Sequence, residues 1–446
     1  MSTIPMMGQS WKLLNPVLSH TIVTNSQNPH TLWVGNWAHQ LYRSYDAGTS
    51  WTIVEIGSTD VPNFLMSIVT AQTDTNVIVV GGFGVDGIRR SIDAGRTWTR
   101  VLTDSARLAM YFISEAILED VSQPGRYFGA RGTPPRNNSI WESINNGATW
   151  DSISVLPPTF TDRLCTIAQR KDSANILFVG CRGGIIARSD DRGRTWRAVP
   201  VLRGMLNISG DAEVPKIVFS ARYPRVGYAI VAITSPDSIN DNGGVLKTVD
   251  GGATWDRIAF ADTSLWSVDV RDGANGEDDV FIGGFRTSNR PTTIKGDGLV
   301  ARSTDGGQTW SQYTDIPWGI NEREDTIRNV WSIHCEPKLK RVYMTAETGT
   351  YILNEPTSAV DNNETDSHQT LRYTVGTNEI VVTDLDPTDD HTSWTLYTMN
   401  GNLVLSGDVV SPDAQRISTT SLASGLYLLT WGSERRFRTA HIPVVR

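Results

Sequence analysis

The apolar residues of this chain fall in short runs, and polar turns rich in glycine, proline, asparagine and aspartate separate these runs. The first complete unit predicts strands at residues 20–25, 31–36 and 40–44, and similar units follow along most of the chain. Short runs with regular turn signals favour strands over helices. No run approaches the roughly 18 apolar residues that a membrane-spanning helix needs. The hydropathy pattern therefore predicts an all-β protein without a transmembrane helix.

One eight-residue pattern, Ser/Thr-x-Asp-x-Gly-x-Thr/Ser-Trp, occurs six times, and successive copies start 46 to 59 residues apart. Such a period is typical of propellers and other repeat arrays. The third residue can accept hydrogen bonds that stabilise a turn, the glycine permits a positive φ, and the tryptophan buries a large ring. The copies lie at residues 44–51, 91–98, 143–150, 189–196, 248–255 and 303–310, and their third residues are Asp46, Asp93, Asn145, Asp191, Asp250 and Asp305.

Three predicted strands precede each octet and a fourth follows it, which makes one propeller blade. A further three strands without an octet are predicted at residues 330–336, 341–346 and 349–353. Residues 9–14 look like the strand that leaves an octet, although no octet precedes them. We therefore predict that residues 9–14 complete a seventh blade and close the ring, which removes its open edges. Six blades plus an unrelated hairpin is the alternative.

The octet resembles the Asp-box, also called the bacterial neuraminidase repeat, and the resemblance covers about residues 9–355. In that family the box joins the third and fourth strands of a blade and has a structural role. The box occurs in sialidases, xyloglucan-degrading enzymes, sortilin-type receptors and a photosystem assembly factor. The resemblance implies a β-propeller, and the count of strand units predicts seven blades at residues 1–355. The resemblance leaves the function open, because one fold can carry many activities.

A second domain is predicted after a polar, acidic linker at residues 356–368. Residues 369–446 contain seven short predicted strands, which suggests a small β-sandwich. They carry Leu-Tyr-x-x-Asn-Gly-x-Leu-Val at 396–404, Ser-Leu-Ala-Ser-Gly-Leu-Tyr-Leu-Leu at 421–429 and a basic stretch at 435–438.

These features resemble the C-terminal sorting domain of proteins exported by the type IX secretion system. Pro443 in the last strand departs from the family pattern, since proline belongs at a sheet edge. The resemblance implies a secreted or cell-surface protein whose residues 369–446 interact with the secretion machinery. A generic carbohydrate-binding or fibronectin-like module is the alternative.

Charge and motifs narrow the function classes. The net charge is −8 and no dense lysine and arginine cluster is present, so nucleic-acid binding is not expected. No metal-ligand spacing and no phosphate-binding loop occurs, so we expect no metal and no cofactor. The first residues lack the basic and apolar regions of a secretory signal.

Cys165 and Cys181 are predicted on neighbouring strands, and a cross-strand disulfide between them is the hypothesis. Cys335 is predicted to be buried.

Candidate ligand-binding residues lie in loops on the face opposite the octets, where propellers usually carry function. Aromatic rings beside carboxylates suit sugar binding, and two opposed carboxylates could hydrolyse a glycosidic bond. Solvated loop charge is the alternative interpretation of each carboxylate. The arginine-bearing start motif of sialidases is missing before the first octet. The candidates are Trp37, Asp104, Asp162, Arg182, Asp262, Trp266, Arg286, Trp318 and Asp325.

The function expected from these patterns is binding of a protein, peptide or glycan on the loop-rich face, with no catalytic residue assigned. A scaffold subunit of a cell-envelope complex is a related hypothesis. A glycoside hydrolase or lyase that acts in the propeller channel, other than a sialidase, is the alternative.

Overall fold

The computed structural model describes most of the chain, and every regular element within the described residues is a β-strand. No helix in this part of the chain is long and apolar enough to cross a membrane. The described residues are 6–7, 11–36, 40–57, 64–83, 87–102, 114–132, 138–157, 163–203, 212–233, 243–286, 295–319, 327–355, 372–376, 378–383, 393–398, 403–408, 414–433 and 436–444.

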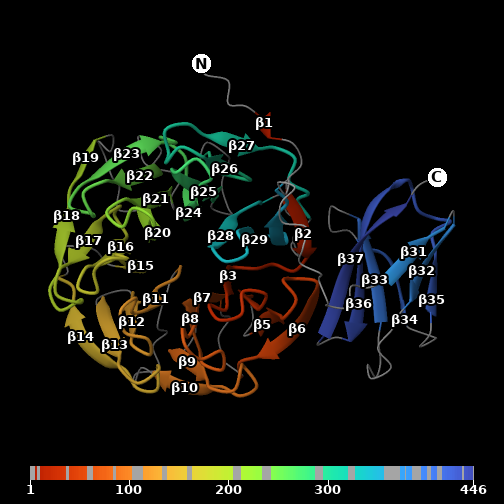
Figure 1. Ribbon diagram of the computed structural model, residues 1–446, viewed down its shortest axis with the longest axis horizontal. Helices are drawn as coiled ribbons and strands as arrows, with labels where there is room; N and C mark the ends of the chain where they lie inside the picture. The colour runs from red at the N-terminus through yellow and green to blue at the C-terminus, as the bar shows by residue number, and fades with distance from the viewer. Residues whose placement is uncertain are drawn as a thin grey trace.

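Seven sheets, each built on four antiparallel strands, stand around a central axis as the blades of a propeller (Figure 1). Blade 1 comprises β3 (Thr21–Thr24), β4 (Leu32–Gly35), β5 (Gln40–Ser44) and β6 (Ser50–Glu55). Blade 2 comprises β7 (Phe64–Thr70), β8 (Ile78–Phe83), β9 (Ile88–Ser91) and β10 (Thr99–Leu102). Blade 3 comprises β11 (Ile117–Glu119), β12 (Tyr127–Arg131), β13 (Ser139–Ser143) and β14 (Asp151–Val155).

The remaining blades follow the same order from the axis to the rim. Blade 4 comprises β15 (Leu164–Gln169), β16 (Leu177–Cys181), β17 (Ile186–Ser189) and β18 (Arg197–Val199). Blade 5 comprises β20 (Ala212–Phe219), β21 (Gly227–Ile233), β22 (Gly244–Thr248) and β23 (Trp255–Ala259), and blade 6 comprises β24 (Leu265–Asp272), β25 (Asp278–Gly284), β26 (Val300–Ser303) and β27 (Ser311–Tyr313). Two short strands, β19 (Val201–Arg203) and β1 (Met6–Met7), add in parallel to the outer strands of blades 5 and 6.

Blade 7 combines both ends of the propeller sequence. Its inner strands are β28 (Val330–Glu336), β29 (Arg341–Ala346) and β30 (Gly349–Leu353), and its outer strand is β2 (Trp11–Asn15) from the N-terminal region. β2 pairs antiparallel with β30, so that Trp11 opposes Leu353. The prediction of a seventh blade closed from the N-terminus is confirmed, and the alternative of six blades plus a hairpin is wrong.

Each octet forms the turn between the third and fourth strands of its blade, and the sixth octet illustrates its hydrogen bonds. Ser303 Oγ donates to Asp305 Oδ1 (2.7 Å) and accepts from Gly307 N (2.8 Å). Asp305 Oδ1 also accepts from Thr309 N (2.8 Å), and the indole of Trp310 donates to Gly307 O (3.2 Å). The side chains of Ser303 and Asp305 therefore satisfy main-chain N–H groups that a tight turn would otherwise leave unpaired.

The octet glycine is required by both conformation and space. Gly252 has a φ of +79°, and a Cβ atom at this position would lie 2.3 Å from Cζ of Phe178 on blade 4. Any other residue would combine a strained backbone with a clash against the neighbouring blade.

A recurring hydrogen bond links neighbouring blades. In four blades the basic residue directly before the octet reaches the fourth residue of the next octet and donates to its carbonyl oxygen. The bonds run from Arg43 to Ala94 (2.7 Å), from Arg90 to Asn146 (2.5 Å), from Arg188 to Gly251 (3.0 Å) and from Lys247 to Gly306 (2.6 Å). The octets thus stabilise contacts between blades as well as the turns themselves.

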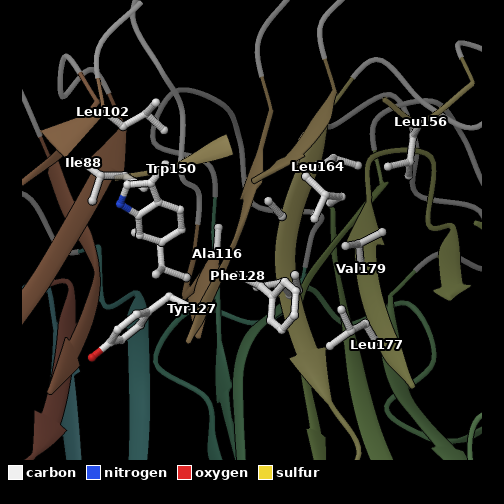
Figure 2. Close-up of a cluster of buried hydrophobic side chains, with 14 of the residues drawn as sticks. Ile88, Leu102, Ala116, Tyr127, Phe128, Trp150, Leu156, Leu164, Leu177 and Val179 are labelled. Carbon is white, nitrogen blue, oxygen red and sulfur yellow. The ribbon is translucent and has the colours of Figure 1, made fainter. Parts of the chain in front are cut away.

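Apolar side chains fill the space between blades, and Figure 2 shows one such cluster. Trp150, which ends the third octet, lies beside Ile88 and Leu102 of blade 2. Phe128 of blade 3 belongs to the same cluster as Leu164, Leu177 and Val179 of blade 4. Because each sheet buries both faces against its neighbours, the ring is stabilised by contacts that only a complete set of blades provides.

The pKa values of the octet carboxylates predict that the folded state loses stability in acid. Hydrogen bonds from Thr97, first from its side chain, lower the pKa of Asp93 to about 2. Burial raises the pKa of Asp250, but hydrogen bonds from Thr254 outweigh this effect and lower it to about 2. Because the folded-state pKa lies below the unfolded value of about 3.9, this stabilisation is complete above that value and is lost as the pH falls toward 2.

Between pH 4 and pH 2 we expect the melting temperature of the double variant Asp93→Asn/Asp250→Asn to fall less than that of the parent chain. Asparagine occupies the same position in the third octet, where Asn145 makes the equivalent bonds to Ser143 and Thr149 without a titrating group. Thermal melts at several pH values check the prediction, and an unchanged acid slope in the variant would contradict it.

The C-terminal residues form two layers of strands around one apolar cluster that includes Leu396, Leu429 and Trp431. One sheet contains β31 (Arg372–Val375), β32 (Glu379–Thr383) and β35 (Ala414–Ser418). The other contains β33 (Ser393–Thr398), β34 (Leu403–Asp408), β36 (Gly425–Ser433) and β37 (Arg436–Val444). We call these seven strands the C-terminal module.

The C-terminal module shares a sheet with the propeller. β37 pairs antiparallel with β6, the outer strand of blade 1, through residues 436–438 and 50–52. Pro443 lies beyond this paired segment, where only β36 pairs with β37. The proline therefore occupies a position where the missing N–H group interrupts no bond to β6.

The cysteines do not form the hypothesised disulfide, and all three thiols are free and buried in this structure. A β-bulge between Leu164 and Thr166 leaves Cys165 without a register partner, so that Leu164 opposes Cys181. Burial raises the pKa of the Cys181 thiol above its usual range. The prediction that Cys335 is buried is confirmed.

Candidate functional site

The innermost strands of four blades begin with the same local irregularity. In β7, β15, β24 and β28 the register shifts at the second residue of a four-residue pattern, Leu/Val-x-Ser/Thr-Ile/Val, and the extra residues are Met66, Cys165, Trp266 and Trp331. A β-bulge re-aims the side chain of its extra residue and is over-represented near binding sites. A repeated bulge therefore shapes one end of the central channel.

This end of the channel lies opposite the octets. The N–H group of Ala47, in the first octet, donates to the carbonyl of His30 in the turn after the innermost strand (2.8 Å), and equivalent bonds occur in the other octet-bearing blades. The octets therefore share one end of the ring with those turns. The bulged strand starts, and the loops that follow each second strand, are at the other end.

Aromatic side chains from several blades meet at this bulged end. Trp266 packs against Phe285 with ring centroids 4.6 Å apart, and both contact Trp331 of blade 7 at 5.4 Å. His20 of blade 1 lies 5.0 Å from Trp331 and 5.2 Å from Phe64 of blade 2. We call the group the mouth cluster; its members are His20, Phe64, Met66, Ala232, Trp266, Phe285 and Trp331.

Two polar atoms of the mouth cluster stand out. Within the described part of the chain, Nε1 of Trp266 and Nε1 of Trp331 are buried without a hydrogen-bond partner. A buried donor that makes no bond costs about 1–3 kcal/mol. Phe64 and Trp331 are only partly buried. The cluster thus combines partly accessible aromatic rings with two indole donors, a combination that suits a ligand offering an apolar group and a carbonyl oxygen.

Glu115 joins the mouth cluster to the channel below it. Its N–H group donates to Met66 O of blade 2 (3.1 Å), and its carboxylate accepts from Lys216 of blade 5 (2.7 Å) and from Ser332 of blade 7 (3.1 Å). Ser114 and Glu115 both have left-handed backbone angles, with φ of 41° and 55°. Such strained residues persist only where their surroundings hold them, and they cluster at functional sites.

Lys216 extends across the channel, and its bonds connect three blades. Besides Glu115, its ammonium group donates to Ile333 O on blade 7 (3.1 Å). Burial lowers the pKa of Lys216, but the negative charges of Glu115 and Asp269 outweigh this effect, so that the pKa is raised above its usual value. The lysine is therefore a buried cation held between carboxylates.

A further polar layer lies below Lys216. Nε2 of His334 is 2.8 Å from Thr24 Oγ1 of blade 1, and Asp269 Oδ2 accepts from Cys335 N (2.7 Å). Burial lowers the pKa of His334 and favours its neutral form. Lys216 thus extends across the channel beneath the mouth cluster, and the contacts of His334 and Asp269 link the neighbouring blades 6, 7 and 1.

The predicted site residues are not all brought together. Trp266 belongs to the mouth cluster. Arg286 follows Phe285, donates its N–H group to Asn329 (2.6 Å) and lies 3.5 Å from Asp297.

The other predicted residues lie apart from the mouth cluster or are not described. Trp318 packs against Tyr351 at 5.8 Å on blade 7. Arg182 lies after β16 and forms an isolated bridge with Glu213. Asp262 follows β23 in a turn with a φ of 57°. Four predicted residues lie outside the described residues: Trp37, Asp104, Asp162 and Asp325.

Most of the residues that meet at the mouth are not among those predicted from the sequence. The signal that could have found two of them is the four-residue pattern at residues 65–68, 164–167, 265–268 and 330–333, whose second position carries Met66 and Trp331. No comparable signal marks Glu115 or Lys216. Among the residues that the structure describes, no group of three or more His, Cys, Asp or Glu side chains could hold a metal ion.

The fold and the octets place this chain among β-propellers that carry the Asp-box. A family model for the BNR/Asp-box repeat matches residues 301–312. No curated protein sequence matches the chain. Similarity to solved structures is therefore the main comparison.

Two kinds of solved propeller resemble this chain. A structure of YCF48 bound to a D1 peptide is 13% identical, covers 79% of this chain and 98% of its own, and has a TM-score of 0.52. YCF48 from Cyanidioschyzon merolae is 13% identical, with coverage of 78% and 99% and a TM-score of 0.50. An ancestral GH74 enzyme is 14% identical with a TM-score of 0.58; the match covers 98% of this chain but only 64% of that enzyme. At these identities the similarity establishes the fold alone.

Proposed function

We propose that this protein is a binding propeller that holds a peptide segment of a partner protein at the mouth cluster. The observation that carries the proposal is the pair of buried, unpartnered indole donors of Trp266 and Trp331, beside partly accessible rings, within the described residues. A peptide supplies both a carbonyl oxygen for such donors and an apolar side chain for the rings. The similarity to YCF48, which has been solved with a D1 peptide, is consistent with this class of ligand.

Cleavage of a glycan inside the channel, by a hydrolase or a lyase, is the alternative function. The similarity to a GH74 enzyme supports this alternative at the level of the fold. The channel chemistry favours binding. The Glu115 carboxylate bonds to Lys216 and Ser332, and the Asp269 carboxylate bonds to Cys335 N, so both are occupied by protein partners. A general acid and a general base need free access to the scissile bond and to water.

We expect Trp331→Ala to weaken binding of a captured peptide at least tenfold, because it removes an aromatic surface and one indole donor. A random peptide display library, panned on the full chain, supplies the ligand, and calorimetry measures its affinity. The matched control is Ile92→Ala, which removes an apolar side chain that is 60% exposed on an octet. Thermal melts of both variants separate lost binding from lost folding.

Equal affinity in Trp331→Ala and the parent chain would contradict the proposal. A glycan array run beside the peptide library tests the alternative. Glycan cleavage that disappears in a folded Glu115→Gln variant would instead support a hydrolase or lyase.

The C-terminal module supports a proposal about location. Because its motifs resemble a type IX sorting domain, we propose that the protein is exported by that route and is secreted or held at the outer cell surface, where it serves an envelope partner. In a bacterium that has this system, residues 369–446 fused to an exported fluorescent protein should reach the cell surface. Retention of the fusion in the periplasm, while a known substrate is exported normally, would contradict the proposal.

A further inference from the structure

The outer edge of blade 1 differs from those of the next three blades. On the outer strands of blades 2, 3 and 4 the residues after the octet tryptophan are largely exposed and include Arg100, Asp151 and Arg197. Charged residues on an edge strand discourage further pairing. Within the described residues no strand adds to these three edges.

The corresponding edge of blade 1 is covered by the C-terminal module. β6 carries no charge at the two positions after its octet tryptophan, Thr52 and Ile53, whereas each of the other three outer strands carries one there. Residues 50–52 pair with β37, so that the sheet of blade 1 continues into the module as one eight-stranded sheet. Such edge-to-edge pairing is the geometry of strand addition, in which main-chain hydrogen bonds recognise the added strand.

A second contact lies on the neighbouring blade. Within the module, Tyr397 of β33 opposes Leu428 of β36. The next residues along these strands, Leu396 and Leu429, point to the opposite face and belong to the core of the module. Leu428 is nevertheless fully buried, in an apolar cluster with Trp11 and Leu13 of the closing strand β2, and Tyr397 packs against the same cluster. In Figure 1 the module lies beside β2 and β6.

We propose that β6 and the adjoining rim of blade 7 form a strand-addition site for the C-terminal module, strong enough to retain the module after the chain between them is cut. The occupant is the module of the same chain. Cleavage of the chain between residues 355 and 372 then yields a two-chain protein rather than a free propeller. The module also covers the strand that closes the ring, so its retention protects the closure.

The test uses the full chain with a recognition sequence for a site-specific protease placed within residues 356–371. After complete cleavage, both fragments are expected to elute together in size-exclusion chromatography at the mass of one intact chain. The variant Leu428→Asp should release the module upon cleavage, with at least a tenfold larger dissociation constant. Its matched control, Leu403→Asp, changes a leucine that is 59% exposed on the same sheet and should keep the fragments together.

Three outcomes would overturn the proposal. Separation of the parent fragments after cleavage would show that the interface is too weak. Release by Leu403→Asp as readily as by Leu428→Asp would show that general destabilisation is responsible. Elution at the mass of two chains would assign the site to the module of a second copy. Hydrogen exchange of the uncut variants, followed at residues 50–52 and at the core strands of the module, distinguishes local undocking from unfolding.

Discussion

Replacing Glu115 with alanine is expected to lower the free energy of unfolding by about 3–5 kcal/mol, because it leaves a buried ammonium group without its ion-pair partner. Lys216 is buried, and its ammonium group is held by Glu115 at 2.7 Å and by Ile333 O at 3.1 Å. Chemical denaturation of the parent chain and the variant measures the difference.

The control for this prediction is the double variant Glu115→Ala/Lys216→Met. Methionine removes the buried charge and fills most of the same volume, so the double variant should recover most of the lost stability. A double variant as unstable as Glu115→Ala alone, or a loss below about 1 kcal/mol in that single variant, would contradict the assignment of Glu115 as the partner that Lys216 needs.

The same ion pair predicts a loss of stability in alkali. Because the folded-state pKa of Lys216 is raised above the usual value of 10.5, its contribution is complete below pH 10.5 and is lost as the pH rises through the folded pKa. The variant Lys216→Met should lack this loss. Octet carboxylates and Lys216 thus limit stability at opposite ends of the pH scale.

Deleting residues 1–15 is expected to be the most damaging change of all. It removes β2 with the buried side chains of Trp11, Leu13 and Leu14, each worth about 1.5–3 kcal/mol of burial. The sum, on the order of 5 kcal/mol or more, is comparable with the total stability of many domains. It also exposes the edge of β30 and the module contact at Leu428. The truncated chain should bind a hydrophobic dye and aggregate at temperatures where the parent chain stays folded.

The blades could be predicted from sequence because the residues that form each turn all lie within one octet. The asparagine or aspartate, the glycine and the tryptophan act within eight residues, so their meaning does not depend on the rest of the chain. Blade 7 has no octet, yet its predicted strands at 330–336, 341–346 and 349–353 agree with β28, β29 and β30. Short, mostly apolar runs bounded by turn residues were sufficient there, because these strands bury side chains on both faces between neighbouring blades.

The mouth of the channel could be predicted only in part. Trp266 was a candidate, but the residues around it come from blades 1, 2, 5 and 7 and meet only when the ring closes. The bulges at Met66 and Trp331 depend on the register between strands, and only the recurrence of the four-residue pattern in several blades marks them in the sequence. Glu115 has no distinguishing neighbour in sequence, although its bonds reach four residues on other blades.

Pairing between β37 and β6 was beyond sequence reasoning for a related reason. Main-chain hydrogen bonds along a sheet edge are available to any extended strand. The selection of β6 therefore depends on where the module is carried and on the contact of Leu428 with blade 7. Neither is a local property of residues 436–444. The free state of Cys165 and Cys181 has the same origin, since a single bulge changed which residues face each other.

A disulfide between Lys12→Cys and Ile352→Cys tests the closed ring most directly. These positions oppose each other on β2 and β30, and opposed residues of antiparallel strands have Cα atoms about 4.5–5.5 Å apart, within the range a disulfide accepts. Closure of the ring predicts that the bond forms under mild oxidation, that it appears as faster migration on a non-reducing gel, and that it raises the melting temperature. Two thiols that stay reduced under oxidation, and that both react with an alkylating reagent in the folded protein, would show that β2 does not complete blade 7.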